Sequence, residues 1–226
     1  MSLPPPNLEA DVEFADNPEP RCPCVLLLDT SGSMNGPALA ALNSGLKAFR
    51  DDLGRDPLAS RRVEVAIVTF DSIVHVAQDF VTVDQFQPPV LTAQGTTCMG
   101  AAIHKALDMI QARKAQYKAN GVAYYRPWVF MVTDGEPHGD NEGVVEQAAQ
   151  RIREDEDGKR VAFFAVGVEG ANMARLGEIV VRTPVKLVGL NFVEMFVWLS
   201  RSTQAVSHAQ VSDQVALPPP GWGVVG

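Results

Sequence analysis

The sequence has only three cysteines, and an odd number of thiols cannot all pair with one another. Cys22, Cys24 and Cys98 are spread over 226 residues. Disulfide-dependent secreted domains carry many cysteines in even numbers, so free thiols in a reducing compartment are expected here. Cys22 and Cys24 flank a proline, but a zinc site needs a second pair of Cys or His ligands at matching spacing, which the chain does not supply. We therefore expect these two residues to be inert, partly buried thiols.

Basic residues are also scarce. Nineteen Lys and Arg stand against 27 Asp and Glu, for a net charge of −8 and an isoelectric point of about 5.0. Nucleic acids and anionic membrane surfaces attract proteins through basic faces, and the sequence displays none. Both classes of partner are therefore disfavoured.

Long apolar runs are missing as well. The continuous apolar stretches have the length of strands, whereas a membrane-spanning helix needs about 20 apolar residues. The first twenty residues have neither the basic nor the apolar region of a secretory signal. We therefore expect a soluble protein that is not exported and acts in the cytoplasm.

Proline clusters mark both ends of the chain. Residues 1–21 combine five prolines with scattered acids, which predicts an extended acidic arm that cannot bury enough apolar area to order itself. Residues 22–210 carry regular patterns and have the length of one domain. Residues 211–226 have no periodicity and predict an irregular tail, in which Trp222 could dock on the body.

Two kinds of pattern alternate along residues 22–210. Continuous apolar runs, typical of strands buried on both faces of a parallel sheet, occupy residues 24–28, 128–133 and 161–168. Two β-rich runs, 63–70 and 73–80, are separated by two residues and predict a hairpin whose antiparallel strand lies at an edge of the sheet. Another short strand is expected around residues 185–188.

Amphipathic stretches follow most of these runs. Helical spacing of apolar residues covers residues 37–53, 99–120, 141–156, 171–178 and 191–207. Right-handed connections between such units give an α/β fold, with a doubly wound, mostly parallel sheet, one antiparallel edge strand and helices on both faces. Ligands of this architecture bind at the carboxyl ends of the strands.

Three polar segments fall where buried strands end or a helix begins. They are Asp29–Ser33, Gly95–Thr97 and Thr133–Gly135. Each segment alone is an ordinary turn or helix lead-in, but together they are expected at one edge of the sheet. They offer two carboxylates and several hydroxyls, which suits Mg²⁺, a hard cation that prefers six oxygen ligands and keeps some of its waters. An open position on such an ion attracts a carboxylate.

The runs VLLLDTSGSM (25–34), QGTTCMGAAI (94–103) and VFMVTDGEP (129–137) resemble the metal-ion-dependent adhesion site of von Willebrand factor A domains. The resemblance implies the Rossmann-like fold of that family and a module that binds a protein partner, which presents a carboxylate to Mg²⁺ or Mn²⁺. One departure is Thr96, which stands where the family usually has glycine. The metal ligands implied by the resemblance are Asp29, Ser31, Ser33, Thr97 and Asp134.

The body of the chain, residues 21–207, is also similar to the short TerY-like A-domain proteins of bacterial tellurium-resistance clusters. The run LNFVEMFVWLSRST (190–203) is part of this resemblance. It implies a cytoplasmic bacterial protein of the metal-stress response, whose partners are a Ser/Thr kinase and a phosphatase.

Two other functions stay open. Phosphatases with a strand-terminal aspartate nucleophile use Asp-x-Asp, and here Ser31 replaces the second aspartate, which removes the general acid. A phosphate-binding loop would need lysine where Ala101 follows Gly100. We therefore expect no enzyme, with a Mg²⁺-dependent phosphatase-like activity as one alternative and a scaffold stabilised by the ion as the other. His138 could rim the site and select partners.

Overall fold

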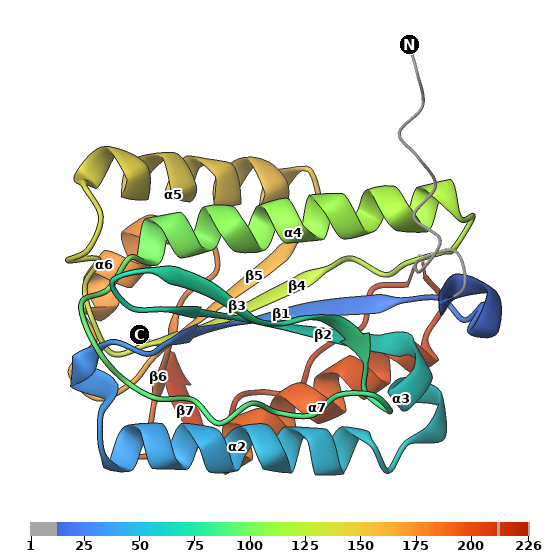
Figure 1. Ribbon diagram of the computed structural model, residues 1–226, viewed down its shortest axis with the longest axis horizontal. Helices are drawn as coiled ribbons and strands as arrows, with labels where there is room; N and C mark the ends of the chain where they lie inside the picture. Colours follow the sequence, from blue (N-terminus) through green and yellow to red (C-terminus); the bar gives the residue numbers. More distant parts are fainter. Residues whose placement is uncertain (1–12, 212, 226) are drawn as a thin grey trace.

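The computed structural model describes residues 13–211 and 213–225, and one seven-stranded sheet runs through this part of the chain (Figure 1). The strand order is β3-β2-β1-β4-β5-β6-β7. The strands are β1 (Cys22–Asp29), β2 (Val63–Phe70), β3 (Val74–Thr82), β4 (Trp128–Thr133), β5 (Ala162–Gly167), β6 (Val185–Leu187) and β7 (Gly223–Val225). The five central strands are parallel, whereas β3 and β7 pair antiparallel to their neighbours at the two edges. The predicted doubly wound, mostly parallel sheet with an antiparallel hairpin strand at its edge is confirmed.

Helices cover both faces of the sheet, as Figure 1 shows. On one face lie α2 (Pro37–Leu53), α3 (Pro57–Arg62) and α7 (Phe192–His208), and on the other lie α4 (Met99–Ala119), α5 (Glu142–Asp157) and α6 (Met173–Ile179). Every residue of β1 and β4 is buried between these layers. Burial on both faces explains why these strands read as continuous apolar runs. None of the helices in the described part of the chain is long and apolar enough to cross a membrane.

The N-terminal segment is more ordered than expected. Residues 13–16 are helical, and Phe14 packs edge-to-face on Tyr117 with ring centroids 5.7 Å apart. Arg21 is completely buried and pairs with Glu64 at 2.8 Å. The prediction of an extended arm is therefore wrong for residues 13–21, because an aromatic anchor and a buried ion pair hold them to the body. The rest of the predicted arm, residues 1–12, lies outside the described residues.

The prediction of an irregular tail is wrong for its last residues. β7 pairs antiparallel with β6, and Trp222 packs edge-to-face on Trp198 with ring centroids 5.7 Å apart. The Trp198 indole N–H donates to the carbonyl oxygen of Pro218 at 2.9 Å. Trp222 therefore docks on the body and brings the short strand to the edge of the sheet.

Candidate metal centre

The turns after β1 and β4 lie side by side at the carboxyl edge of the sheet. These two strands are parallel neighbours, with Leu28 opposite Val132. A chain of hydrogen bonds joins the turns: Ser31 Oγ lies 3.0 Å from Ser33 Oγ, which donates to Asp134 Oδ1 at 2.9 Å. Oxygens from two segments about a hundred residues apart in the sequence therefore form one cluster.

Asp29 forms the buried end of this cluster. One carboxylate oxygen accepts the backbone N–H of Ser31 at 2.8 Å, and the other accepts the hydroxyl of Thr133 at 2.6 Å. Burial raises the pKa of Asp29, hydrogen bonds from Ser31 and Thr133 oppose that rise, and the charge of Asp134 adds to it. A poorly hydrated carboxylate therefore lies near a second one, and a divalent cation between them would favour their ionised forms.

Asp134 and Ser33 form the open end of the cluster. Asp134 is partly buried, and Ser33 is exposed. Burial raises the pKa of Asp134, whereas hydrogen bonds from Ser33 and Ser31 lower it. The cluster thus runs from a buried carboxylate to one that meets solvent.

Thr97 approaches the cluster from a third segment. Its side chain is almost fully buried, and a Cβ on Gly135 would lie 3.5 Å from Thr97 Oγ1, so the hydroxyl faces the turn that follows β4. The Thr97 carbonyl accepts the backbone N–H of Gly139 at 3.0 Å. All five residues implied by the resemblance therefore lie in adjacent segments at one edge of the sheet.

The segment before α4 is held against the β2–β3 turn. Gly95 has a φ of +70°, and a Cβ there would overlap Ser72 Oγ, so only glycine fits this close approach. Ser72 Oγ accepts the backbone N–H of Thr96 at 3.0 Å and lies 3.2 Å from its hydroxyl. Threonine in place of the family's usual glycine at position 96 is therefore accommodated by a hydrogen bond at the surface.

Two residues at this edge support the cluster without being among the implied metal ligands. Thr133 positions Asp29, as described above. Asp140 accepts the backbone N–H of Gly100 at 2.6 Å and that of Ala101 at 3.4 Å, and so caps the first turn of α4. The Cys98 side chain, at the N-cap position itself, makes no capping hydrogen bond. Thr133 was visible in the Thr-Asp-Gly motif, whereas no local signal identified Asp140.

Two cysteines and one histidine were also singled out from the sequence. Cys22 and Cys24 are completely buried, and burial together with the charge of Glu64 raises the pKa of the Cys22 thiol to about 12. Such thiols are poor nucleophiles and metal ligands at neutral pH, which agrees with the prediction of inert residues. His138 is exposed in the turn after β4, and its backbone N–H donates to the carbonyl oxygen of Glu136 at 2.8 Å.

The composition of the cluster restricts which ion it could hold. Over residues 13–211 and 213–225, no three His, Cys, Asp or Glu side chains gather in a group suited to a metal. The cluster at the sheet edge has two carboxylates, and hydroxyls supply its other oxygens. Such a set lacks the nitrogen and sulfur ligands of zinc and offers the hard oxygens preferred by Mg²⁺ or Mn²⁺.

The fold and this cluster define an α/β protein with a candidate ion site at the carboxyl edge of its sheet. The sequence matches the profile of the von Willebrand factor type A domain over residues 24–188. The chain therefore belongs to this family, whose domains are generally protein-interaction modules. No curated protein matches the chain in sequence.

Solved structures share the fold at low sequence identity. A von Willebrand factor type A structure from Catenulispora acidiphila has 17% identity and a TM-score of 0.63, covering 82% of this chain and 43% of that one. The pilus adhesin SpaC from Lactobacillus rhamnosus GG, in its open conformation, has 15% identity and a TM-score of 0.63, covering 83% and 30%. The D319A mutant of the PilB minor pilin from Streptococcus sanguinis has 13% identity and a TM-score of 0.61, covering 87% and 64%. In each comparison the chain spans less than two thirds of the other protein.

Proposed function

We propose that this chain is a metal-dependent protein-binding module, to which a partner protein presents a carboxylate. The residues that would hold Mg²⁺ or Mn²⁺ are Asp29, Ser31, Ser33, Thr97 and Asp134. The observation that carries the proposal is the continuous run of oxygens from Ser31 through Ser33 to Asp134, which joins two loops into one cluster.

The spacing of these oxygens fits a small octahedral cation. With metal–oxygen distances of about 2.0–2.1 Å, neighbouring ligands of such an ion lie about 3 Å apart. The distances of 3.0 Å between the two serine hydroxyls and 2.9 Å from Ser33 to Asp134 match this requirement. A bound ion would supply a hard positive centre for a carboxylate, because two acidic ligands no more than balance its charge.

Burial favours binding over catalysis. Asp29 is completely buried, and both of its oxygens accept hydrogen bonds, so it cannot reach the phosphorus of a substrate as a nucleophile. Exposure of Ser33 and partial exposure of Asp134 favour a ligand-binding role over a scaffold in which the ion only stabilises loops. The open end of the cluster is where a visiting carboxylate would approach.

A narrower role is proposed from the sequence of residues 21–207 alone. The resemblance of residues 21–207 to TerY-like proteins supports action in bacterial tellurium resistance and the metal-stress response, in the cytoplasm. In that role the partners are a Ser/Thr kinase and a phosphatase.

The decisive experiment is capture of proteins from the native host with the tagged full chain, in Mg²⁺ and in EDTA. We expect a partner that is retained in Mg²⁺ and lost in EDTA, and also lost with Ser33→Ala or Asp134→Asn. Asp157→Asn is the matched control, because this exposed residue ends α5 at the opposite edge of the sheet. Capture that is unchanged by EDTA and by both site variants, in folded protein, would reject the binding role in favour of the scaffold.

The enzyme alternative has its own assay. Release of phosphate from p-nitrophenyl phosphate in Mg²⁺ should stay at the level of a blank reaction. Turnover that disappears with Asp29→Asn would overturn the proposal in favour of a phosphatase.

A further inference from the structure

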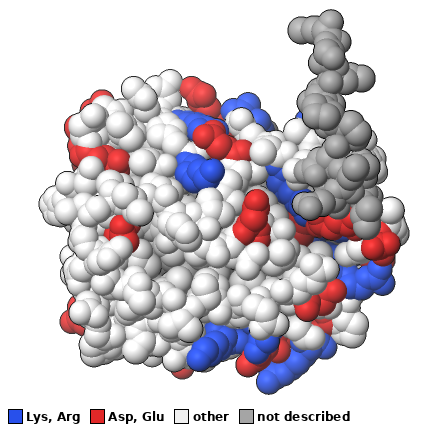
Figure 2. All heavy atoms as spheres, viewed as in Figure 1, with Lys and Arg blue, Asp and Glu red and all other residues white. Residues whose placement is uncertain are grey.

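The loops around the proposed metal site carry acidic side chains and no lysine or arginine. Six segments follow strands or precede α4 at this edge, namely residues 29–36, 70–73, 94–98, 134–141, 168–172 and 188–191. Their charged residues are Asp29, Asp71, Asp134, Glu136, Asp140 and Glu169. Figure 2 shows this end, at the left of the view, in red and white, with blue only from the middle to the right. One end of the molecule is therefore negative.

Four of these acids surround the proposed ligands without belonging to them, and we name them the acidic rim: Asp71, Glu136, Asp140 and Glu169. Three have other contacts. Asp71 accepts the backbone N–H of Ile73 at 3.0 Å, Glu136 accepts the side-chain amide of Asn172 at 2.6 Å, and Asp140 caps α4. Because these contacts already engage the three carboxylates, their charges stay around the cluster and do not enter it.

Arg175, in the first turn of α6 beside these loops, does not neutralise the rim. Arg175 pairs with Glu142, and with Glu178 at 2.8 Å. Its charge is already shared by two carboxylates outside the rim. A visiting anionic group therefore meets a net negative surface around the proposed ion.

A second observation indicates that the centre of the rim is built for a ligand. Thr97 is only 4% exposed, and within the described residues its hydroxyl makes no hydrogen bond. The hydroxyl faces the turn at Gly135. Because this hydroxyl is not sealed from solvent, it is free to contact an ion at the centre of the rim.

We propose that the partner binds through a single acidic residue set within a basic segment. This inference rests on the proposed function and adds the chemistry of the partner. The central carboxylate approaches the metal, and flanking lysines or arginines face the acidic rim. A carboxylate without such neighbours is repelled by the rim, since like charges placed together oppose association, whereas opposite charges speed it.

Three synthetic peptides test the inference by fluorescence anisotropy with the full chain. One has a central glutamate between lysines, the second has the same glutamate between serines, and the third has glutamine between lysines. In Mg²⁺ we expect the first to bind about tenfold more tightly than the second, and the third to bind no better in Mg²⁺ than in EDTA. The advantage of lysine should shrink between about 50 and 300 mM salt, because added salt shortens the Debye length and screens the charges of the rim.

A charge-reversing substitution tests whether the rim itself, and not the net charge of the protein, attracts the lysines of the peptide. Glu169 is exposed, and Glu169→Lys should weaken the lysine-flanked peptide about three- to tenfold and leave the serine-flanked peptide unweakened. Asp157→Lys is the matched control, because it makes the same change of charge at the opposite edge of the sheet and should have little effect. Circular dichroism and the Mg²⁺-induced shift in melting temperature verify that both variants fold and bind the ion.

The outcomes distinguish this inference from the proposed function. Equal, Mg²⁺-dependent binding of the two glutamate peptides would overturn the acidic-rim inference and leave the binding function intact. The inference would also be overturned if both lysine-flanked peptides bound equally well, with glutamate or glutamine at the centre and in Mg²⁺ or EDTA. Such binding would be a general attraction between opposite charges. If no peptide bound in Mg²⁺, the inference would be rejected, and so would the proposed function, in which the metal binds a carboxylate of the partner.

Discussion

Thr133 Oγ1 donates a hydrogen bond of 2.6 Å to Asp29 Oδ2, from the last residue of β4 to the last residue of β1. Both side chains are completely buried. A buried carboxylate loses its hydration, so hydrogen bonds from the protein must replace the lost contacts with water. The sheet itself thus orients Asp29, and the residue that does so is outside the implied ligand set.

Replacing this threonine should destabilise the protein. Thr133→Val keeps the shape of the side chain but removes the donor to a buried carboxylate, and should lower the free energy of unfolding by about 1.5–3 kcal/mol. It should also weaken the stabilisation by Mg²⁺, because Asp29 is no longer held in place. Urea denaturation with and without Mg²⁺ measures both effects. Thr133→Ser, which keeps the hydroxyl, should stay close to wild type, and equal stability of Thr133→Val and wild type would contradict the assigned role.

Asp140 should contribute to stability and not to metal binding. Its carboxylate caps the first turn of α4 through Gly100 and Ala101, so Asp140→Ala should lower the free energy of unfolding by about 1 kcal/mol. The increase in melting temperature caused by Mg²⁺ should remain, whereas Asp134→Asn should abolish it. Differential scanning fluorimetry over a Mg²⁺ titration compares the two variants. Loss of the Mg²⁺ response in Asp140→Ala would assign this residue to the ion site.

Long-range contacts set the limit of what sequence patterns predict here. Asp29 and Asp134 could be placed at one edge because the carboxyl ends of parallel strands meet there. Asp140 could not, because its capping of α4 joins residues 40 apart in the sequence and depends on how the loop after β4 folds back. The distance between the serine hydroxyls likewise follows from the path of the loop and not from its residue types.

The two ends of the chain show the same limit. Residues 13–21 are acidic and contain prolines, a composition that predicts an extended arm. Their ordered structure depends on the packing of Phe14 on Tyr117 and on the burial of Arg21 in the core. β7 has three residues and no alternation of its own. Its place depends on Trp222 meeting Trp198, a contact that no local pattern encodes.

Asp56 should make stability depend on acid pH. Burial raises the pKa of Asp56, but hydrogen bonds from the backbone of Ala59 and Leu58 and the contact with His208 at 2.7 Å outweigh it, so the pKa lies below its ordinary value. A carboxyl whose pKa is lowered by folding stabilises the protein above its unfolded pKa of about 3.9, and this contribution is lost as pH falls through the folded pKa.

Asp56 is the N-cap residue of α3. Asp56→Ala should therefore cost about 1 kcal/mol at pH 7, the typical value of an N-cap, and less as pH falls below about 4. Urea denaturation of both proteins at several pH values gives the difference. Asp56→Asn keeps an acceptor for the cap but cannot ionise, so it should lose less at neutral pH and add no acid dependence. A deficit of Asp56→Ala that is constant over this pH range would show that the charge of Asp56 contributes nothing.

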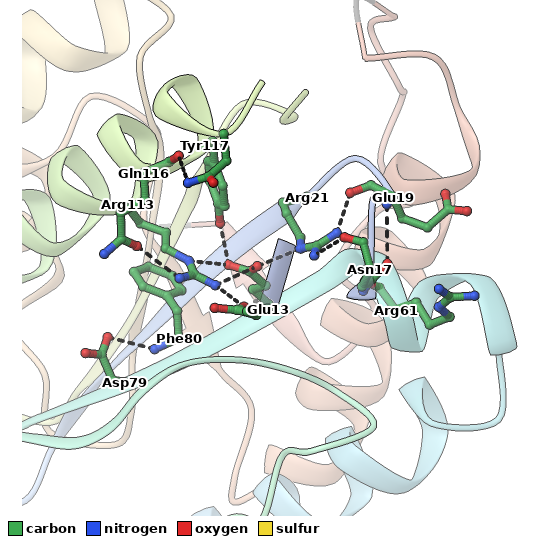
Figure 3. Close-up of polar contacts among 12 residues, drawn as sticks. Glu13, Asn17, Glu19, Arg21, Arg61, Asp79, Phe80, Arg113, Gln116 and Tyr117 are labelled. Atoms are coloured by element: carbon green, nitrogen blue, oxygen red, sulfur yellow. Dashed lines mark hydrogen bonds and ion pairs between the residues drawn. The ribbon is translucent and has the colours of Figure 1, made fainter. Parts of the chain in front are cut away.

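A buried ion cluster at the amino ends of the parallel strands, opposite the proposed metal site, gives the strongest stability prediction (Figure 3). Glu64 on β2 is completely buried and accepts hydrogen bonds from Arg21 at 2.8 Å, from Arg113 at 2.9 Å and from the hydroxyl of Tyr117. Arg113 also pairs with Glu13, which belongs to the N-terminal segment. Two guanidinium groups thus depend on two carboxylates, of which one is in the core and one is partly exposed.

Glu64→Gln should lower the free energy of unfolding by about 3–5 kcal/mol, because it leaves two arginines with one carboxylate in a site that excludes water. Glu13→Gln removes only the partly exposed partner of Arg113 and should cost less than about 1 kcal/mol. Urea denaturation of both variants tests this order, and equal losses would show that the buried carboxylate is not the centre of the cluster. Because the cluster lies at the other end of the strands from Asp29, the melting shift caused by Mg²⁺ should be preserved in Glu13→Gln.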